Sequence, residues 1–349
     1  MDWMLYGANG YTGRLAAREA VRRGSSPVLA GRNGDAVASL AKELGLQHRV
    51  FGLDDPQSVR EALEGVKAVL HCAGPFSATS APMVDACLAT GTHYLDITGE
   101  ISVFEAVHAR HQEARRRDVV LLPGAGFDVV PTDCMAARLV EALPAATSLK
   151  LAFDAGGGPS PGTAKTSLER LGQGGCIRRD GTLQNVPLAW KTRSIPFANG
   201  ERMAVTIPWG DVYTAHVSTG IPDIEVYLAL PPKAIDRMQR LRRLQPLLRL
   251  GVVQSFLRKR IEKGVKGPSD DRRAATGVQL WGCVESADGR SLAATMQTPN
   301  GYDLTVDASL TLAAHLLEND VEGGFYTPSL LMGAGFAERL DGVSFALQS

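Results

Sequence analysis

The sequence has no excess of either charge, because 37 lysines and arginines are matched by 37 aspartates and glutamates in 349 residues. With 44% hydrophobic and 21% charged residues, the composition gives no reason to expect disorder or a nucleic-acid partner. No apolar run reaches about 18 residues, so no transmembrane helix is expected. Residues 1–6 are typical of a strand rather than of a secretory signal, and we therefore expect a cytoplasmic protein.

The cysteines are few and form no C-x-x-C pair; they are Cys72, Cys87, Cys134, Cys176 and Cys283. This spacing disfavours a zinc ribbon, a redox motif and a disulfide framework. The close pair His108 and His111 has no nearby carboxylate support, so no metal site is predicted. Residues 158–162 match G-x-S-x-G, but Pro161 lacks the backbone N–H that an oxyanion hole would need, which excludes a nucleophile elbow.

Short apolar runs alternate with helix-like segments over the first 130 residues. Strands are predicted over 3–6, 27–30, 48–51, 68–72, 93–97 and 119–122, and helices over 13–23, 35–44, 55–63, 81–90 and 102–117. Alternation with such short connections predicts an α/β fold with a doubly wound parallel sheet and helices on both faces.

The pattern changes after Pro131. Residues 155–162 are a turn-rich joint, and strands are predicted over 188–196, 202–207, 225–230 and 278–285. These favour a second, mixed α/β domain with an antiparallel sheet, followed by an apolar helix over 304–317. At about 150 residues per domain, we predict a cofactor domain over 1–135 and a substrate domain over 136–300.

The loop after the first strand is rich in glycine. Its predicted ligand-binding residues are Gly7, Asn9, Gly10, Tyr11, Thr12 and Gly13. Glycines between a strand and a helix allow a tight turn and a close approach of backbone to a pyrophosphate, which the helix N-terminus then attracts. The spacing G-x-x-G-x-x-G differs from the usual G-x-G-x-x-G, but its place favours a Rossmann-type dinucleotide site over a turn that serves packing alone.

The end of the second strand indicates which dinucleotide is bound. An NAD site usually places a carboxylate there for the ribose 2′-OH. Here the residues are Gly31, Arg32 and Asn33, and Arg32 could pair with a 2′-phosphate. NADP(H) is therefore the predicted cofactor; the alternative for Arg32 is a solvated surface arginine.

Three later strand ends should also face the cofactor, because ligands bind at the carboxyl ends of parallel strands. They are residues 73–76, 96–100 and 124–128. Ala73, Gly74, Pro75 and Phe76 suit a close approach of backbone to the nicotinamide ribose.

Residues 233–266 are strongly basic, with eleven lysines and arginines against two acids and a net charge of +9. Apolar residues lie in the middle of this stretch. Basic flanks around an apolar helix suit a membrane surface or a lipid substrate. The alternative is a surface helix whose apolar side packs inside the second domain; a nucleic-acid partner is disfavoured because aromatic interleaving is missing.

Taken together, these motifs resemble the saccharopine dehydrogenase-like oxidoreductases, with the trans-acting enoyl reductase branch as the best match. The matching segments are residues 7–13, 30–33, 72–76, 94–100, 124–133, 162–167, 267–272, 301–302 and 323–328. The resemblance extends over nearly the whole chain and implies an NADP-type Rossmann domain, a second α/β domain and a C-terminal segment over 301–349 that packs back toward the first.

The resemblance also implies reduction with NADPH, here of the C=C bond of a small-molecule or carrier-tethered acyl thioester from lipid or polyketide synthesis. The candidate catalytic residues are Asp128, Tyr94, Glu100 and Lys165, with Asp128 placed first by its position after the sixth strand. Two alternatives remain open: a C–N oxidoreductase acting on an amino acid or imine, and a non-catalytic NADP-binding protein at a lipid surface. A homodimer and a peripheral membrane contact are compatible with the sequence.

Overall fold

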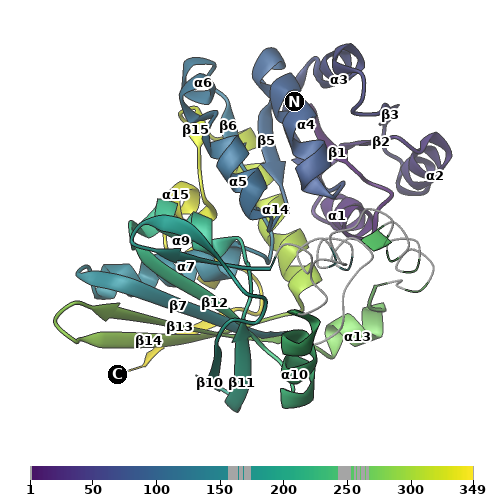
Figure 1. Cartoon of the computed structure of the whole chain (residues 1–349). Helices are drawn as coiled ribbons and strands as arrows, with labels where there is room; N and C mark the ends of the chain where they lie inside the picture. Colours follow the sequence, from purple (N-terminus) through teal and green to yellow (C-terminus); the bar gives the residue numbers. More distant parts are fainter. Residues whose placement is uncertain are drawn as a thin grey trace. The chain divides into compact units, whose positions relative to one another are not determined.

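The computed structural model divides into two compact units (Figure 1). It describes residues 2–155, 174–242 and 267–348, and between these ranges residues 164, 168, 253, 254, 257, 260 and 264. Unit 1 contains Met1–Val130 and Tyr302–Leu331. Unit 2 contains Pro131–Gly301 and Met332–Ser349.

Unit 1 is built on a parallel sheet with the strand order β15-β6-β5-β4-β1-β2-β3. Its strands are β1 (Asp2–Tyr6), β2 (Val28–Gly31), β3 (His48–Val50), β4 (Val66–His71), β5 (His93–Asp96), β6 (Val120–Leu122) and β15 (Gly324–Phe325). The central strands are buried on both faces: Leu5, Leu29 and Leu70 are fully inaccessible to solvent. This confirms the predicted doubly wound parallel sheet.

The helices of unit 1 form two layers. They are α1 (Tyr11–Arg22), α2 (Gly34–Leu44), α3 (Pro56–Leu63), α4 (Phe76–Thr90), α5 (Ile101–His108), α6 (His111–Arg116) and α14 (Gly301–Glu318). Helices α3, α4 and α5 pack side by side (Figure 1). Because right-handed crossovers reverse direction at β1, α1 and α2 cover the opposite face. Helix α14 joins α1 there through Arg23 and Asp307, 2.8 Å apart, and through the rings of Tyr11 and Tyr302.

Two helices differ from the sequence prediction. Helix α4 starts at Phe76 rather than near residue 81, because the carboxylate of Glu100 accepts hydrogen bonds from its first backbone N–H groups. The single helix predicted over 102–117 is interrupted between α5 and α6. After this break, Nδ1 of His111 accepts a hydrogen bond from the backbone of Phe325 in β15, a contact that no local pattern could indicate.

Unit 2 contains a mixed sheet with the strand order β10-β11-β12-β7-β13-β14-β16, and β8 also pairs with β12 and β9. The strands are β7 (Ala146–Ala155), β8 (Gly175–Arg179), β9 (Thr182–Val186), β10 (Thr192–Phe197), β11 (Gly200–Thr206), β12 (Asp223–Ala229), β13 (Val278–Ser286), β14 (Ser291–Thr298) and β16 (Ser344–Gln348). The described helices are α7 (Val130–Ala142), α9 (Asp211–Thr219), α10 (Pro232–Leu241), α13 (Asp270–Ala274) and a short 3₁₀ turn, η2 (Ala337–Arg339). The second α/β domain is confirmed. Its sheet, predicted to be antiparallel, is antiparallel along its main path except where β7 and β12 pair parallel.

The C-terminal segment predicted over 301–349 is divided in the structure. Residues 302–331 belong to unit 1 and contribute α14 and β15 to it. Helix α15 (Pro328–Met332) follows, and residues 332–349 belong to unit 2, where β16 pairs with β14. The sequence lacked a sign of this division because a lone edge strand such as β16 has no period of its own to detect.

Part of the basic stretch packs inside unit 2. Helix α10 buries Ile235 against Leu188, Ala189 and Val205. The Arg242 guanidinium donates hydrogen bonds to the backbone carbonyls of Leu188 and Ala189. For residues 233–242 the structure therefore agrees with the packed-helix alternative. Most of residues 243–266 lies outside the described residues.

The two faces of the unit 2 sheet are packed differently. Helix α7 lies so close to β13 that a Cβ at Gly282 would be 2.6 Å from the sulfur of Met135 and 2.9 Å from a methyl of Leu139. The neighbouring residue Trp281 points to the other face, into a cluster with Tyr227 and Phe197. The absence of a side chain at residue 282 thus lets α7 pack directly on the sheet.

We predict that Gly282→Ala lowers the free energy of unfolding by about 1–3 kcal/mol, because the added methyl overpacks the contact between α7 and β13. Denaturant unfolding measures this change. Gly335→Ala is the matched control, since a Cβ there meets its nearest atom only at 4.0 Å. Equal stability of the two variants would contradict this description of the contact.

Candidate functional site

The glycine loop lies where the sheet of unit 1 changes direction. Strands β1 and β4 are neighbours, and the chain continues from them toward opposite edges. Such a switch point leaves a crevice at the carboxyl ends of the strands, where open α/β sheets bind ligands. Residues 7–13, 31–33 and 73–76 follow β1, β2 and β4 at this edge, so the structure brings the predicted cofactor residues together.

Two glycines in this loop are required by close backbone contacts. Gly7 has φ +81°, and a Cβ there would lie 2.8 Å from the backbone nitrogen of Ala73. A Cβ at Gly13 would lie 2.3 Å from the carbonyl oxygen of Gly7. Side chains at these positions would separate β1 from the end of β4 and lift α1 away from the loop.

The N-terminus of α1 is open in a way that the next two helices are not. Its N-cap is Gly10; no side chain caps it, and its first turn holds no acidic residue. By contrast, the Asn33 side chain accepts a hydrogen bond from the backbone of α2, and Asp55 does the same for α3. Uncapped N–H groups and a positive helix end are what a pyrophosphate needs. This loop therefore fits the phosphates of a dinucleotide.

Arg32 and Asn33 have separate roles at the end of β2. The Asn33 amide is used as the α2 cap, with its Oδ1 3.1 Å from the nitrogen of Ala36. Arg32 is exposed directly beside it and has no ion-pair partner among the described residues. An exposed guanidinium at this position is available for a 2′-phosphate.

The loop after β4 is fastened from both sides. Thr79 donates its hydroxyl hydrogen to the carbonyls of Ala73, at 2.7 Å, and Pro75, at 3.1 Å. The Glu100 carboxylate accepts hydrogen bonds from the backbone of Phe76, at 3.0 Å, and Ser77, at 2.8 Å. Both Glu100 oxygens are thus engaged, which suits a residue that shapes the loop; its predicted catalytic role remains a prediction.

His71 supports the same loop from inside the sheet. Its Nε2 lies 3.0 Å from Oγ1 of Thr79. Because the Thr79 hydrogen is directed to carbonyls, Nε2 of His71 must carry the donated hydrogen. Nδ1 is buried without a partner, and complete burial lowers the pKa of His71 to about 3. His71 is therefore a neutral support at neutral pH.

Tyr94 and Asp96 form a buried pair at the end of β5. The Tyr94 hydroxyl donates to Oδ2 of Asp96 at 2.6 Å, and both residues are fully inaccessible to solvent. Burial raises the pKa of Asp96 to about 6, partly opposed by the hydrogen bonds it accepts. Burial also raises the pKa of Tyr94 well above 10. The predicted catalytic residue Tyr94 therefore lies below the protein surface, out of contact with a ligand.

Asp128 is the candidate acid that lies at the surface of unit 1. It is half-buried in the loop between β6 and α7, and a Cβ at Gly99 would lie 2.4 Å from its Oδ2. The missing side chain at Gly99 makes room for this carboxylate. The fourth candidate, Lys165, lies outside the described residues.

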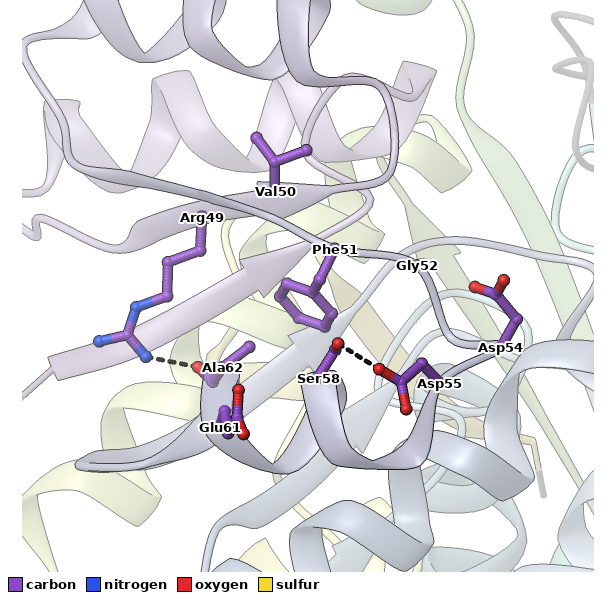
Figure 2. Close-up of a pocket in the computed structure, with 9 residues that line it drawn as sticks. All are labelled: Arg49, Val50, Phe51, Gly52, Asp54, Asp55, Ser58, Glu61 and Ala62. Carbon is purple, nitrogen blue, oxygen red and sulfur yellow. Dashed lines mark hydrogen bonds between the residues drawn. The ribbon is translucent and has the colours of Figure 1, made fainter.

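A cavity of about 440 Å³ lies between β3 and α3, as Figure 2 shows. Its lining includes the carboxylates of Asp54, Asp55 and Glu61. Arg49 also lines it, but its guanidinium donates to the carbonyl of Ala62 at the end of α3 (Figure 2). Three acids beside an engaged arginine would repel phosphates, so the phosphate site is assigned to the glycine loop.

Neither a metal site nor a membrane span is found in the described part of the chain. No group of three or more His, Cys, Asp or Glu there could hold a metal ion. No described helix is both long enough and apolar enough to cross a membrane.

The sequence did not indicate the buried residues whose hydrogen bonds hold the loops of the site in place. Asp96, His71 and Thr79 are buried or half-buried and have no period or motif of their own. Only its position in the chain could have indicated Asp96. It ends a buried strand, in a segment that was expected to face the cofactor. A carboxylate at such a place needs donors, and only the fold shows which ones it has.

A doubly wound parallel sheet, with an uncapped glycine-rich helix start at its switch point, defines unit 1 as a Rossmann-type dinucleotide-binding domain. Residues 3–122 match the family model described as the saccharopine dehydrogenase NADP binding domain. This match agrees with the resemblance for the first domain and with NADP(H) as the cofactor.

Curated relatives come from two groups. A probable mitochondrial saccharopine dehydrogenase-like oxidoreductase of Arabidopsis thaliana is 32% identical over 38% of this chain and 33% of its own length. A trans-acting enoyl reductase of Mycobacterium leprae is 34% identical over 38% of this chain and 34% of its own. The chain thus aligns with about a third of each relative's length, less than the nearly complete match expected from the motifs.

Solved structures extend the likeness in fold to the rest of the chain. A saccharopine dehydrogenase (L-Glu forming) of Saccharomyces cerevisiae covers 100% of both chains with a TM-score of 0.68 at 12% identity. A homospermidine synthase of Legionella pneumophila, solved with NAD, covers 99% of this chain and 91% of its own with a TM-score of 0.63 at 11% identity. At such identities the likeness concerns the fold alone.

We predict that His71 makes stability fall in acid. Its pKa is about 3 in the folded protein and 6.5 as a model value, so the unfolded state takes up the proton first as the pH falls. His71→Asn should reduce the loss of unfolding free energy between pH 7 and 4 by about 2–3 kcal/mol. Urea unfolding at both pH values measures this.

The control is His48→Asn, because His48 is exposed on β3. Asp96, with its raised pKa, acts in the opposite direction between about pH 4 and 6 and is present in both variants. If the unfolding free energy of His71→Asn falls between pH 7 and 4 as much as that of the parent protein, His71 is not the neutral buried residue described above.

Proposed function

We propose that the protein is an NADPH-dependent oxidoreductase. The observation that carries the proposal is the open N-terminus of α1 beside the exposed Arg32. The helix end suits the pyrophosphate, and the guanidinium suits the 2′-phosphate that distinguishes NADP(H) from NAD(H). The family match over residues 3–122 and the oxidoreductases among the relatives support the same class.

We predict that Arg32→Ala weakens NADPH binding by about tenfold or more and leaves NADH binding unchanged, because a charge-assisted hydrogen bond contributes about 1.5–3 kcal/mol. Calorimetric titration with each nucleotide measures both affinities. Arg60→Ala, at an exposed arginine of α3, is the control. Tighter binding of NADH than of NADPH by the parent protein would remove the basis for the role of Arg32.

For the substrate, we propose an activated C=C bond of an acyl thioester. Bound NADPH supplies a hydride equivalent. The protein must then deliver a proton to the acceptor and polarise the thioester carbonyl. The proposal rests on the enoyl reductases among the relatives, which align with this chain over 38–40% of its length. A carrier-tethered acyl chain belongs to the same proposal, together with a lipid contact through the part of the basic stretch that follows residue 242.

Asp128 is the proposed proton donor. Its carboxyl is half-buried in a loop at the carboxyl edge of the sheet, the edge at which the phosphate loop also lies. Gly99 leaves space for the carboxyl beside the loop after β5. Glu100 and Tyr94 are less suited because both side chains are buried.

We predict that Asp128→Asn lowers kcat for an enoyl thioester by about 10²–10⁴-fold while NADPH affinity is kept, because an amide cannot donate a proton. Stopped-flow NADPH oxidation measures the rate. Asp320→Asn, at an exposed aspartate after α14, is the control. Unchanged turnover in Asp128→Asn would remove Asp128 from the reaction.

The same assay separates the competing functions. NADPH oxidation is followed with an enoyl thioester and, in parallel, with a keto acid plus an amine. Turnover of the second pair alone would favour C–N oxidoreduction. Turnover of neither, together with NADPH binding and sedimentation with anionic liposomes, would favour a non-catalytic protein at a lipid surface.

A further inference from the structure

Asp96 lies where three loops of unit 1 meet, although it has no exposed surface. It is the last residue of β5, and the loops after β4 and β6 follow the two strands that flank β5. Its contacts therefore determine how these loops are placed relative to one another.

The carboxylate of Asp96 joins the loop after its own strand to the loop after β6. Oδ1 accepts hydrogen bonds from the backbone N–H groups of Thr98, at 2.9 Å, and Gly124, at 3.0 Å. The backbone carbonyl of Asp96 accepts a further one from Ala125 at 2.7 Å. Two loops are thus fastened by one residue.

The third loop is reached through Glu100. The turn that Asp96 forms with Thr98 continues directly, because Oγ1 of Thr98 accepts the backbone N–H of Glu100 at 3.0 Å. Glu100 in turn holds the first two N–H groups of α4, immediately after Gly74 and Pro75. Displacing Asp96 would therefore also release the start of α4 and the loop before it.

We propose that Asp96 is a positioning residue of the cofactor site: it holds the loops after β4, β5 and β6 in the arrangement that receives the nicotinamide half of NADP(H). The inference rests on the proposed function. Because Asp96 is fully buried, it acts through the loops and does not itself touch a ligand.

The charge of Asp96 is part of this arrangement. Oδ1 already accepts two backbone N–H groups, so a proton can only be added at Oδ2, where Tyr94 donates. Among the described residues, the other titratable groups that face Asp96 are Glu100 after its own strand, the thiol of Cys72 after β4, and His71, its register partner in β4. His71 is neutral because burial lowers its pKa to about 3. None of these is a cation, and protonation of Asp96 would disturb the hydrogen bond from Tyr94.

Two substitutions separate the carboxylate's roles. In Asp96→Asn, the amide oxygen can still accept from Thr98 and Gly124, and the amide nitrogen can donate to the Tyr94 hydroxyl oxygen. In Asp96→Leu, the side chain keeps the same branching at Cγ but no acceptor remains. The first variant carries a neutral group with the donor and acceptor pattern of protonated Asp96, so it should behave like the parent protein at low pH at every pH. The second should release the loops.

The experiment compares the affinities of NADPH and 2′-phospho-ADP-ribose, which lacks the nicotinamide half, between pH 5 and 8. We expect Asp96→Leu to weaken NADPH about tenfold or more and to leave 2′-phospho-ADP-ribose unchanged, because the glycine loop and Arg32 are not touched. The parent protein should lose its preference for NADPH over the fragment below about pH 6. In Asp96→Asn this preference should not depend on pH.

The ratio of the two affinities cancels the titration of the 2′-phosphate, which both ligands carry. Asp288→Asn, at an exposed aspartate that also accepts a backbone N–H, is the control. Equal weakening of both ligands in Asp96→Leu, or a pH dependence of Asp96→Asn like that of the parent, would overturn the proposal. If Asp96→Leu does not fold, the pH profile of Asp96→Asn decides alone. Binding of neither ligand by the parent protein would instead refute the proposed function.

Discussion

Backbone atoms of the first loop lie so close to α1 and to the end of β4 that no side chain fits between them. Gly7 and Gly13 make this contact possible, and it fixes where β1, β4 and α1 meet. The crevice at the switch point and the open start of α1 follow from it. Everything proposed about the cofactor depends on that short distance.

Around this contact, buried polar residues hold the loops in place. His71, Asp96 and Glu100 satisfy backbone groups or the Thr79 hydroxyl at the carboxyl edge of the sheet. A buried polar group is stabilising only when its partners are in place, so these residues favour one arrangement of the loops over others. Asp128, in contrast, is half-buried in the loop after β6, with room made for it by Gly99.

In unit 2, sequence patterns predicted some strands and missed others. Strands such as β12 and β13 were predicted because β-branched and aromatic residues mark them. Strand β7 was missed although it is central, and β14 was missed because its many small residues have weak strand preference. Their place in the sheet is decided by pairing with neighbours, and Gly282 is explained only by the helix that packs on it.

The sequence by itself determined the parallel sheet, the glycine loop and the choice of NADP(H), because these depend on local alternation and on residues adjacent in the chain. The tertiary structure decided the start of α4, the division of residues 301–349 between the units and the contacts of Tyr94, Asp96 and Glu100. The physical reason is distance along the chain: Glu100 caps a helix that begins 24 residues earlier. Such a contact has no spacing that a pattern could show, and it forms only once the strands have placed the loops side by side.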